Sequence, residues 1–147
     1  MLKKVDAYAI YLLIKGVQEF AFTIAFTVMM VYQVTVVGLN PLQLVLVGTA
    51  LEVTVFLFEI PTGVIADVYS RRLSVILGYA LLGIGFIIEG SFPLFSVIIL
   101  ANLVDGFGHT FLSGATSAWL ADEIGQERAG DAFLRGSQVA QVAKLLG

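Results

Sequence analysis

The sequence predicts an all-α membrane protein with four transmembrane helices and the start of a fifth. Composition is the first reason: 59% of the 147 residues are hydrophobic and only 13% are charged, too few charges to cover a soluble domain of this size. The second reason is the length of the apolar stretches, because a bilayer core of about 30 Å needs roughly 20 helical residues.

Short polar breaks separate the predicted helices, which cover residues 8–37, 42–68, 73–91 and 93–120. The first break contains Asn40 and Pro41, because Asn favours turns and Pro cannot continue a helix. Arg71 and Arg72 mark the second break, and Pro93 marks the third. Such short connections make neighbouring helices antiparallel, so we expect one bundle over residues 1–147.

A polar segment over residues 121–134 follows the fourth predicted helix, and we expect a cytoplasmic loop there. Apolar residues return over 135–147 in the pattern of another membrane helix, but they are too few to cross a bilayer. We therefore expect these residues to begin a fifth helix. Since a natural terminus usually follows a complete packed element, we also expect the chain to be the N-terminal part of a longer protein.

Basic residues predict the orientation of the helices. The turns at 38–41 and 92–93 contain no Lys or Arg, whereas the side that holds the N-terminus carries Lys3, Lys4, Arg71, Arg72, Arg128 and Arg135. The positive-inside rule makes that side cytoplasmic, so we expect a multi-pass protein of the cell membrane with a cytoplasmic N-terminus. A cleaved signal peptide agrees less well, because Lys15 and Glu19 interrupt the first apolar run.

The types of residue present argue against an enzyme. The chain has no Cys and only one His, so the sequence offers neither a disulfide framework nor a Cys/His metal site. It contains no phosphate loop and no GxSxG nucleophile elbow. We expect no catalytic residue, no metal, no cofactor and no nucleic-acid partner. The formal net charge of -3 is uninformative here, because in a membrane protein the location of the charges matters more than their sum.

Acidic residues inside the apolar helices are the candidate functional residues, because an ionised side chain at the bilayer centre costs roughly 2.5 to 3.5 kcal/mol. Glu52 and Glu59 lie two turns apart on the second helix, near a stripe that includes Gly48 and Gly63. This face either lines a path for a solute or a proton, or packs closely against another helix through its glycines.

Two other pairs of polar residues lie one helical turn apart. Asp105 and His109 on the fourth helix suit proton exchange, because imidazole titrates near neutrality, although a lone His is often a packed polar residue. Lys15 and Glu19 on the first helix can pair within the helix, but Lys15 can also snorkel to the cytoplasmic interface. Glu19 then remains a candidate for the solute or proton path.

The most specific pattern lies between the second and third predicted helices, in Gly63-Val64-Ile65-Ala66-Asp67-Val68-Tyr69-Ser70-Arg71-Arg72. It resembles the signature loop of the major facilitator superfamily. The first Gly of that loop is Gly63, its acid is Asp67, its basic pair is Arg71 and Arg72, and Ser70 replaces its second Gly. Segments 59–63, 113–115 and 118–123 look like drug-efflux members of the superfamily.

This resemblance implies the N-terminal part of a major facilitator type helical bundle, in which the signature loop acts as a conformational latch against the C-terminal half. For the two arginines, a role in topology alone is the alternative. One departure is Asn102, where the family usually has an Arg, which weakens the case for proton coupling of the family type.

The implied function is transport of a small organic solute, as proton-coupled efflux, by a longer transporter. Its partners would be the lipid bilayer, the solute, protons and the missing C-terminal half. Two alternatives remain. One is a complete four-helix transporter that dimerises and uses Glu19 as its carboxylate, and the other is a membrane scaffold that does not transport and binds partner helices.

Overall fold

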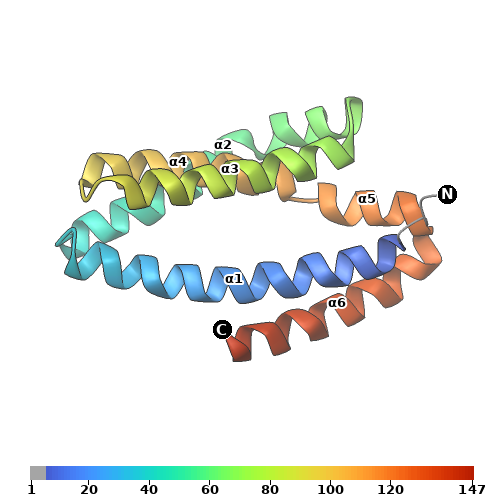
Figure 1. Ribbon diagram of the computed structural model, residues 1–147. Helices are drawn as coiled ribbons and strands as arrows, with labels where there is room; N and C mark the ends of the chain where they lie inside the picture. Colours follow the sequence, from blue (N-terminus) through green and yellow to red (C-terminus); the bar gives the residue numbers. More distant parts are fainter. Residues whose placement is uncertain (1–5) are drawn as a thin grey trace. The chain divides into compact units, whose positions relative to one another are not determined.

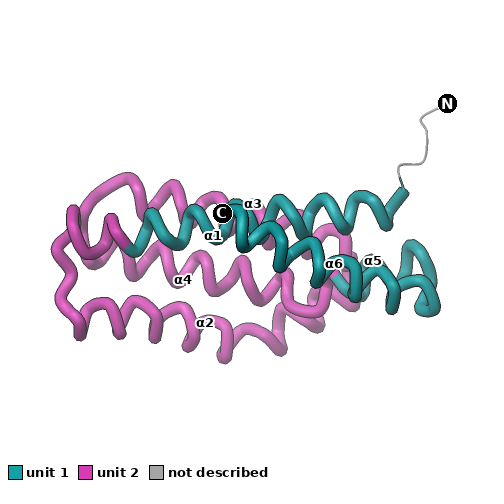
Figure 2. Tube along the Cα trace, turned by 90° about the horizontal axis from the view of Figure 1, so that it is seen from below, with its two compact units in different colours: residues 1–30, 117–147 teal, residues 31–116 magenta. Residues whose placement is uncertain are grey.

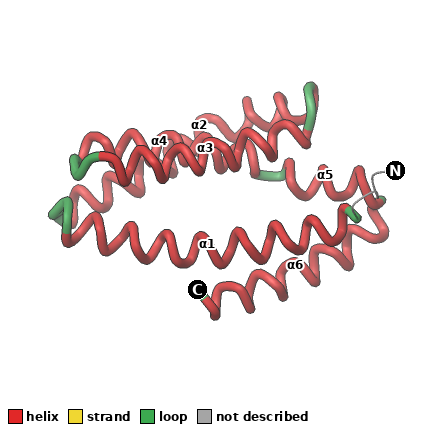
Figure 3. Tube along the Cα trace, viewed as in Figure 1, coloured by secondary structure: helices red, strands yellow, loops and turns green. Residues whose placement is uncertain are grey.

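The computed structural model describes residues 6–147 and folds them almost entirely into helices joined by short loops (Figures 1 and 3). The described residues contain no strand. In chain order the helices are α1 (Ala7–Thr35), α2 (Pro41–Val68), α3 (Arg71–Ser91), α4 (Phe95–Leu112), α5 (Ala115–Ile124) and α6 (Gln126–Leu146). The all-α fold class predicted from the sequence is confirmed.

Four stretches of the described residues are long and apolar enough to cross a membrane, namely Ala7–Thr35, Pro41–Val68, Arg71–Ser91 and Phe95–Ile124. Large apolar side chains remain on the surface, and those of Phe56 and Ile60 are 82% and 79% exposed. A surface of this kind is expected for helices that face lipid. The chain therefore has the build of a multi-pass membrane protein. Two of the basic residues used to predict its orientation, Lys3 and Lys4, lie outside the described residues.

Local sequence explains how the chain turns from α1 into α2. Gly38 has a φ of +71°, a left-handed conformation that glycine adopts without steric penalty. The side chain of Asn40 then accepts a hydrogen bond from the backbone N–H of Gln43, and the Gln43 side chain accepts one from the backbone N–H of Asn40. Pro41 occupies the first turn of α2, where its missing N–H has no helical acceptor to lose.

The span predicted over residues 93–120 is interrupted near its C-terminal end. α4 ends at Leu112, and Gly114 takes a φ of +72° before α5 begins at Ala115. A left-handed residue cannot continue an α-helix, and glycine adopts that conformation at the lowest cost. The fourth apolar stretch therefore consists of two helices.

Helix also occupies most of the segment expected to be a loop over residues 121–134. α5 continues to Ile124, and Gly125, with a φ of +84°, separates it from α6. The last helix thus begins at Gln126 and not at residue 135. Its buried face consists of small residues that add little hydropathy but permit close packing: Ala129, Ala132, Gly136 and Ala143.

The chain divides into two compact units (Figure 2). Unit 1 comprises residues 1–30 and 117–147, and its core brings Tyr11 of α1 together with Leu120 of α5 and Ala132 of α6. Unit 2 comprises residues 31–116, in which α2 and α3 both pack against α4 (Figures 1 and 2). The candidate site lies in unit 2.

Candidate functional site

Unit 2 contains three polar side chains that we call the buried polar centre: Gln33 at the end of α1, Glu89 on α3 and Asp105 on α4. Gln33 Nε2 donates a hydrogen bond to Glu89 Oε1 at 2.6 Å. The Asp105 carboxyl faces the part of α3 that carries Glu89. Only 3% of Glu89 and 8% of Asp105 is exposed, so both acids are removed from the apolar surface of the unit.

Asp105 lies directly against α3. A Cβ atom added to Gly85 would be only 1.8 Å from Asp105 Oδ1, so the carboxyl occupies space that glycine leaves open. Gly85 is one turn before Glu89 on the same face of α3. Asp105 Oδ1 is buried and has no hydrogen-bond partner among the described residues. A buried acceptor without a donor costs free energy, so this oxygen needs an explanation.

Glycines bring the helices around this centre into close contact. A Cβ atom added to Gly108 of α4 would be 3.0 Å from the carbonyl oxygen of Gly78 on α3. One added to Gly106 of α4 would be 2.7 Å from the Cβ of Thr54 on α2. Small residues let membrane helices approach in this way. Because α4 packs closely on α2 and α3, the two buried acids are separated from the lipid-facing surface.

The two acids predicted on α2 have different surroundings. Glu52 and Glu59 are both exposed, and Glu59 Oε1 accepts a hydrogen bond from Ser113 Oγ at 2.8 Å. A Cβ atom added to Gly48 or Gly63 would meet nothing within 4 Å. Among the described residues, these two glycines therefore do not mark a close helix contact, and packing through them finds no support in unit 2.

Asp105 and His109, which the sequence predicted as a pair on α4, have their surroundings on two different helices. Asp105 turns its carboxyl to Gly85 on α3, whereas half-buried His109 lies within the electrostatic influence of Glu52 on α2. Asn102 is buried and donates a hydrogen bond from Nδ2 to the carbonyl oxygen of Ile98 in its own helix at 2.9 Å. Asn102 is neutral, so it contributes no charge to this part of α4.

The predicted signature loop forms an ion pair. Arg71 Nη2 is 3.1 Å from Asp67 Oδ1, and both side chains are substantially exposed, as is Arg72. Ser70 has extended backbone, with a φ of -172°, and its hydroxyl oxygen accepts a hydrogen bond from the backbone N–H of Leu73 at 3.3 Å. Serine in place of the second glycine therefore causes no backbone strain and instead caps α3.

In unit 1, Glu19 pairs with a partner that the sequence analysis did not anticipate. Its Oε2 is 3.2 Å from Nζ of Lys144 on α6, whereas the sequence suggested Lys15. Nearby, a Cβ atom added to Gly136 of α6 would be 2.7 Å from a ring carbon of Tyr11, so α6 packs tightly on α1. A paired Glu19 is a poorer candidate for the free carboxylate that the dimeric transporter alternative requires.

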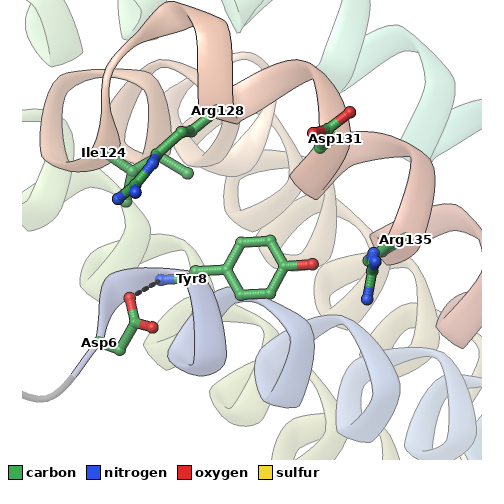
Figure 4. Close-up of a pocket in the computed structure, with 6 residues that line it drawn as sticks. All are labelled: Asp6, Tyr8, Ile124, Arg128, Asp131 and Arg135. Atoms are coloured by element: carbon green, nitrogen blue, oxygen red, sulfur yellow. Dashed lines mark hydrogen bonds between the residues drawn. The ribbon is translucent and has the colours of Figure 1, made fainter.

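Unit 1 also contains a polar pocket of about 410 Å³ (Figure 4), lined by Asp6, Tyr8, Ile124, Arg128, Asp131 and Arg135. Asp6 Oδ1 accepts a hydrogen bond from the backbone N–H of Tyr8 at 3.2 Å, and the Tyr8 ring extends between Arg128 and Arg135 in Figure 4. Two acids and two bases line the pocket, so its formal charges balance and it has no evident preference for an anion or a cation.

Sequence reasoning missed two members of the buried polar centre, Gln33 and Glu89. Both lie near the ends of their helices, where polar residues are common and a charge is expected to reach the interface. A signal was nevertheless present on α3, because Gly78, Leu82, Gly85 and Glu89 recur at intervals of three and four residues. That stripe places Glu89 on the face that α3 buries.

Sequence comparison relates the chain to a transporter. It is 26% identical over 109 residues to YxaM of Bacillus subtilis strain 168, an uncharacterised MFS-type transporter. The aligned region covers 72% of this chain and 27% of YxaM, so the chain spans about a quarter of the length of the curated relative it matches. No family model and no solved structure matches the chain. The chain is thus similar to part of an MFS-type transporter.

Proposed function

We propose that this chain is part of a secondary transporter of the major facilitator type, which exports a small organic solute across the cell membrane in exchange for protons. Its N-terminus would be cytoplasmic. The observation that carries the proposal is the Asp67–Arg71 ion pair at the turn between α2 and α3. Similarity to an MFS-type transporter over 72% of the chain supports it.

The chemistry of the Asp67–Arg71 pair suits a latch that opens and closes. Asp67 lies at the C-terminal end of α2 and Arg71 at the N-terminal end of α3, so each charge is unfavourable beside its own helix dipole. Their pairing offsets that penalty, but an exposed ion pair of this spacing contributes only about 0.3 to 0.5 kcal/mol. Either residue could therefore exchange its partner for a group on another part of the transporter at little cost.

The acids of the apolar helices support a solute or proton path. Alternating access in secondary transporters uses sites built from residues on facing helices, and ionisable residues inside the membrane are rare unless they serve such a path. Glu52 and Glu59 are exposed on α2, and His109 is half-buried on α4. We propose these three residues as the polar lining that this chain contributes to the solute path, and Asp105 as a candidate for the proton path alone. Glu19 with its partner Lys144 is a secondary candidate.

The test uses the natural full-length gene product in inside-out membrane vesicles with an imposed pH gradient and a panel of labelled amphipathic organic compounds. Wild type should accumulate at least one compound when the gradient is present and lose it when the gradient is collapsed. Asp67→Asn should reduce the initial rate roughly tenfold without reducing the amount of protein in the membrane. Glu127→Gln removes an exposed acid elsewhere and should leave the rate unchanged. If the Asp67 variant transports at the wild-type rate, the proposed latch is wrong.

A further inference from the structure

We propose that Glu89 and Asp105 form a carboxyl pair that binds one proton inside unit 2, with Gln33 holding Glu89 in place. Binding of the proton is independent of what the full transporter moves. Only the use of that proton, as the ion exchanged for the solute, rests on the proposed function.

The first argument is the burial of two like charges. Glu89 is 97% and Asp105 92% buried, by difference from their exposed fractions of 3% and 8%, and the Asp105 carboxyl lies against Gly85, one helical turn from Glu89. Two ionised carboxylates side by side in an apolar interior are strongly unfavourable, and such a pair characteristically shares one proton. A single proton removes one of the two charges.

The second argument is the unpartnered oxygen. Asp105 Oδ1 is buried, lacks a hydrogen-bond partner among the described residues, and lies against Gly85 on the face of α3 that carries Glu89. Gln33 already donates to Glu89 Oε1, so the buried oxygen of the pair that lacks a donor is Asp105 Oδ1. With one proton bound to Asp105, the remaining buried charge is that of Glu89, which has the Gln33 N–H as its donor.

A proton suits this pair better than a metal ion does. No group of three or more His, Cys, Asp or Glu side chains that could hold a metal occurs among residues 6–147. The third polar group of the centre, Gln33, turns N–H and not its carbonyl oxygen to Glu89, and a donor would repel a cation bound there. Two carboxylates alone fall short of the six to eight or so oxygen ligands that Ca²⁺ takes.

Other titratable groups lie on the elements packed around the pair, and none occupies an equivalent position. Within residues 31–116 they are Tyr32 on α1, Glu52, Glu59 and Asp67 on α2, Tyr69 in the turn after it, Arg71, Arg72 and Tyr79 on α3, and His109 on α4. Glu52 and Glu59 are exposed, and His109 is under the electrostatic influence of Glu52. Among the acids of unit 2, burial therefore singles out Glu89 and Asp105.

Infrared difference spectroscopy of the purified full-length protein in lipid tests the proposal without requiring a solute. A protonated carboxyl has a carbonyl stretch separate from the carboxylate bands. Wild type should show such a band that disappears as the pH rises, and the double variant Glu89→Gln/Asp105→Asn should lack it. Glu127→Gln, which neutralises an exposed acid, should keep it. The substitutions preserve the shape of both side chains, and gel filtration checks that the double variant is folded. If the double variant does not fold, each single variant is measured in its place.

Two results would overturn the proposal. One is a carboxyl band of the same intensity in wild type and in a folded variant, because the proton would then reside elsewhere. The other is loss of the wild-type band at constant low pH when sodium chloride replaces choline chloride, because the pair would then be a sodium site.

Transport then tests the use of the proton. Vesicles that contain the double variant should still exchange labelled for unlabelled solute but should no longer respond to a pH gradient. A variant that keeps the wild-type response would overturn the coupling role while leaving the proposed transport intact. If wild type transports no compound at all, the proposed function fails, and the infrared result alone decides whether the pair binds a proton.

Discussion

Unit 2 carries two pairs of acids in apolar helices, and the pairs differ in what surrounds them. Glu89 and Asp105 are buried, and their places depend on an absent side chain at Gly85 and a hydrogen bond from Gln33. Glu52 and Glu59 are exposed on α2, and the Glu59 carboxyl accepts a hydrogen bond from Ser113 Oγ. Hydropathy alone therefore does not distinguish acids that are buried between helices from acids that are exposed on a helix surface.

The largest expected effect is that of Gly85→Ala. The added methyl group would overlap Asp105 Oδ1, at 1.8 Å, and must displace the carboxyl or separate α3 from α4. Overpacking of this kind should lower the free energy of unfolding by about 2 to 3 kcal/mol. The measurement is denaturant unfolding of the purified full-length protein in detergent micelles.

Gly83→Ala is the matched control, because a Cβ atom at Gly83 on the same helix would meet nothing within 4 Å. That change should raise the free energy of unfolding by about 0.5 to 1 kcal/mol, since alanine favours a helix interior over glycine. Equal stability of the two variants would mean that Asp105 does not lie against Gly85.

Gln33→Leu should come next. It removes the donor to Glu89 Oε1 and leaves a buried carboxyl oxygen unsatisfied, at a cost of about 1 to 2 kcal/mol in the same assay. In a Glu89→Leu background the same change should cost little, because replacing both partners by apolar groups is nearly neutral. An equal loss in both backgrounds would show that Gln33 contributes packing and not a hydrogen bond.

Ser113→Ala breaks the hydrogen bond to the exposed acid Glu59 and should cost only about 0.5 kcal/mol, because water can replace the lost donor. Ser117→Ala, at an exposed position nearby in the sequence, serves as its control. If Ser113→Ala lowered the free energy of unfolding as much as Gln33→Leu does, the hydrogen bonds of the exposed and the buried acids would not differ in their contribution to stability.

The smallest expected effect on stability is that of Asp67→Asn. Its ion pair with Arg71 is exposed, so the variant should lose less than about 0.5 kcal/mol, and the difference from wild type should shrink as salt is added. Unfolding at low and high ionic strength measures this. A loss above about 1 kcal/mol would make the pair a structural element and would remove the argument that it is easily exchanged.

The apolar spans could be predicted from the sequence because each is long, and because the breaks at Asn40 and Pro93 contain residues with known turn preferences. Helix α6 could not be predicted in full. Its buried face consists of alanine and glycine, which pack well against Tyr11 but contribute little to a hydropathy window. The break at Gly114 was missed because the left-handed conformation of a glycine is not visible in composition.

The candidate site was predicted only in part, for a related reason. Asp105 was recognised as an acid far inside a span, whereas Glu89 lies two residues before the end of α3 and looks like an interfacial charge. Its burial depends on which neighbour covers that end of the helix, and the neighbour is Gln33, 56 residues away in the chain. Sequence patterns report the face of one helix but not the partner that another helix supplies.

The short connection between α3 and α4 bears on how the protein enters the bilayer. Three residues, from Phe92 to Leu94, join the two helices, so α3 and α4 can insert together as a hairpin. A lone α4 would expose Asp105 to lipid at roughly 2.5 to 3.5 kcal/mol. In a hairpin the carboxyl lies against Gly85 and not against acyl chains. The glycine that makes room for Asp105 in the folded state thus also eases its passage into the membrane during synthesis.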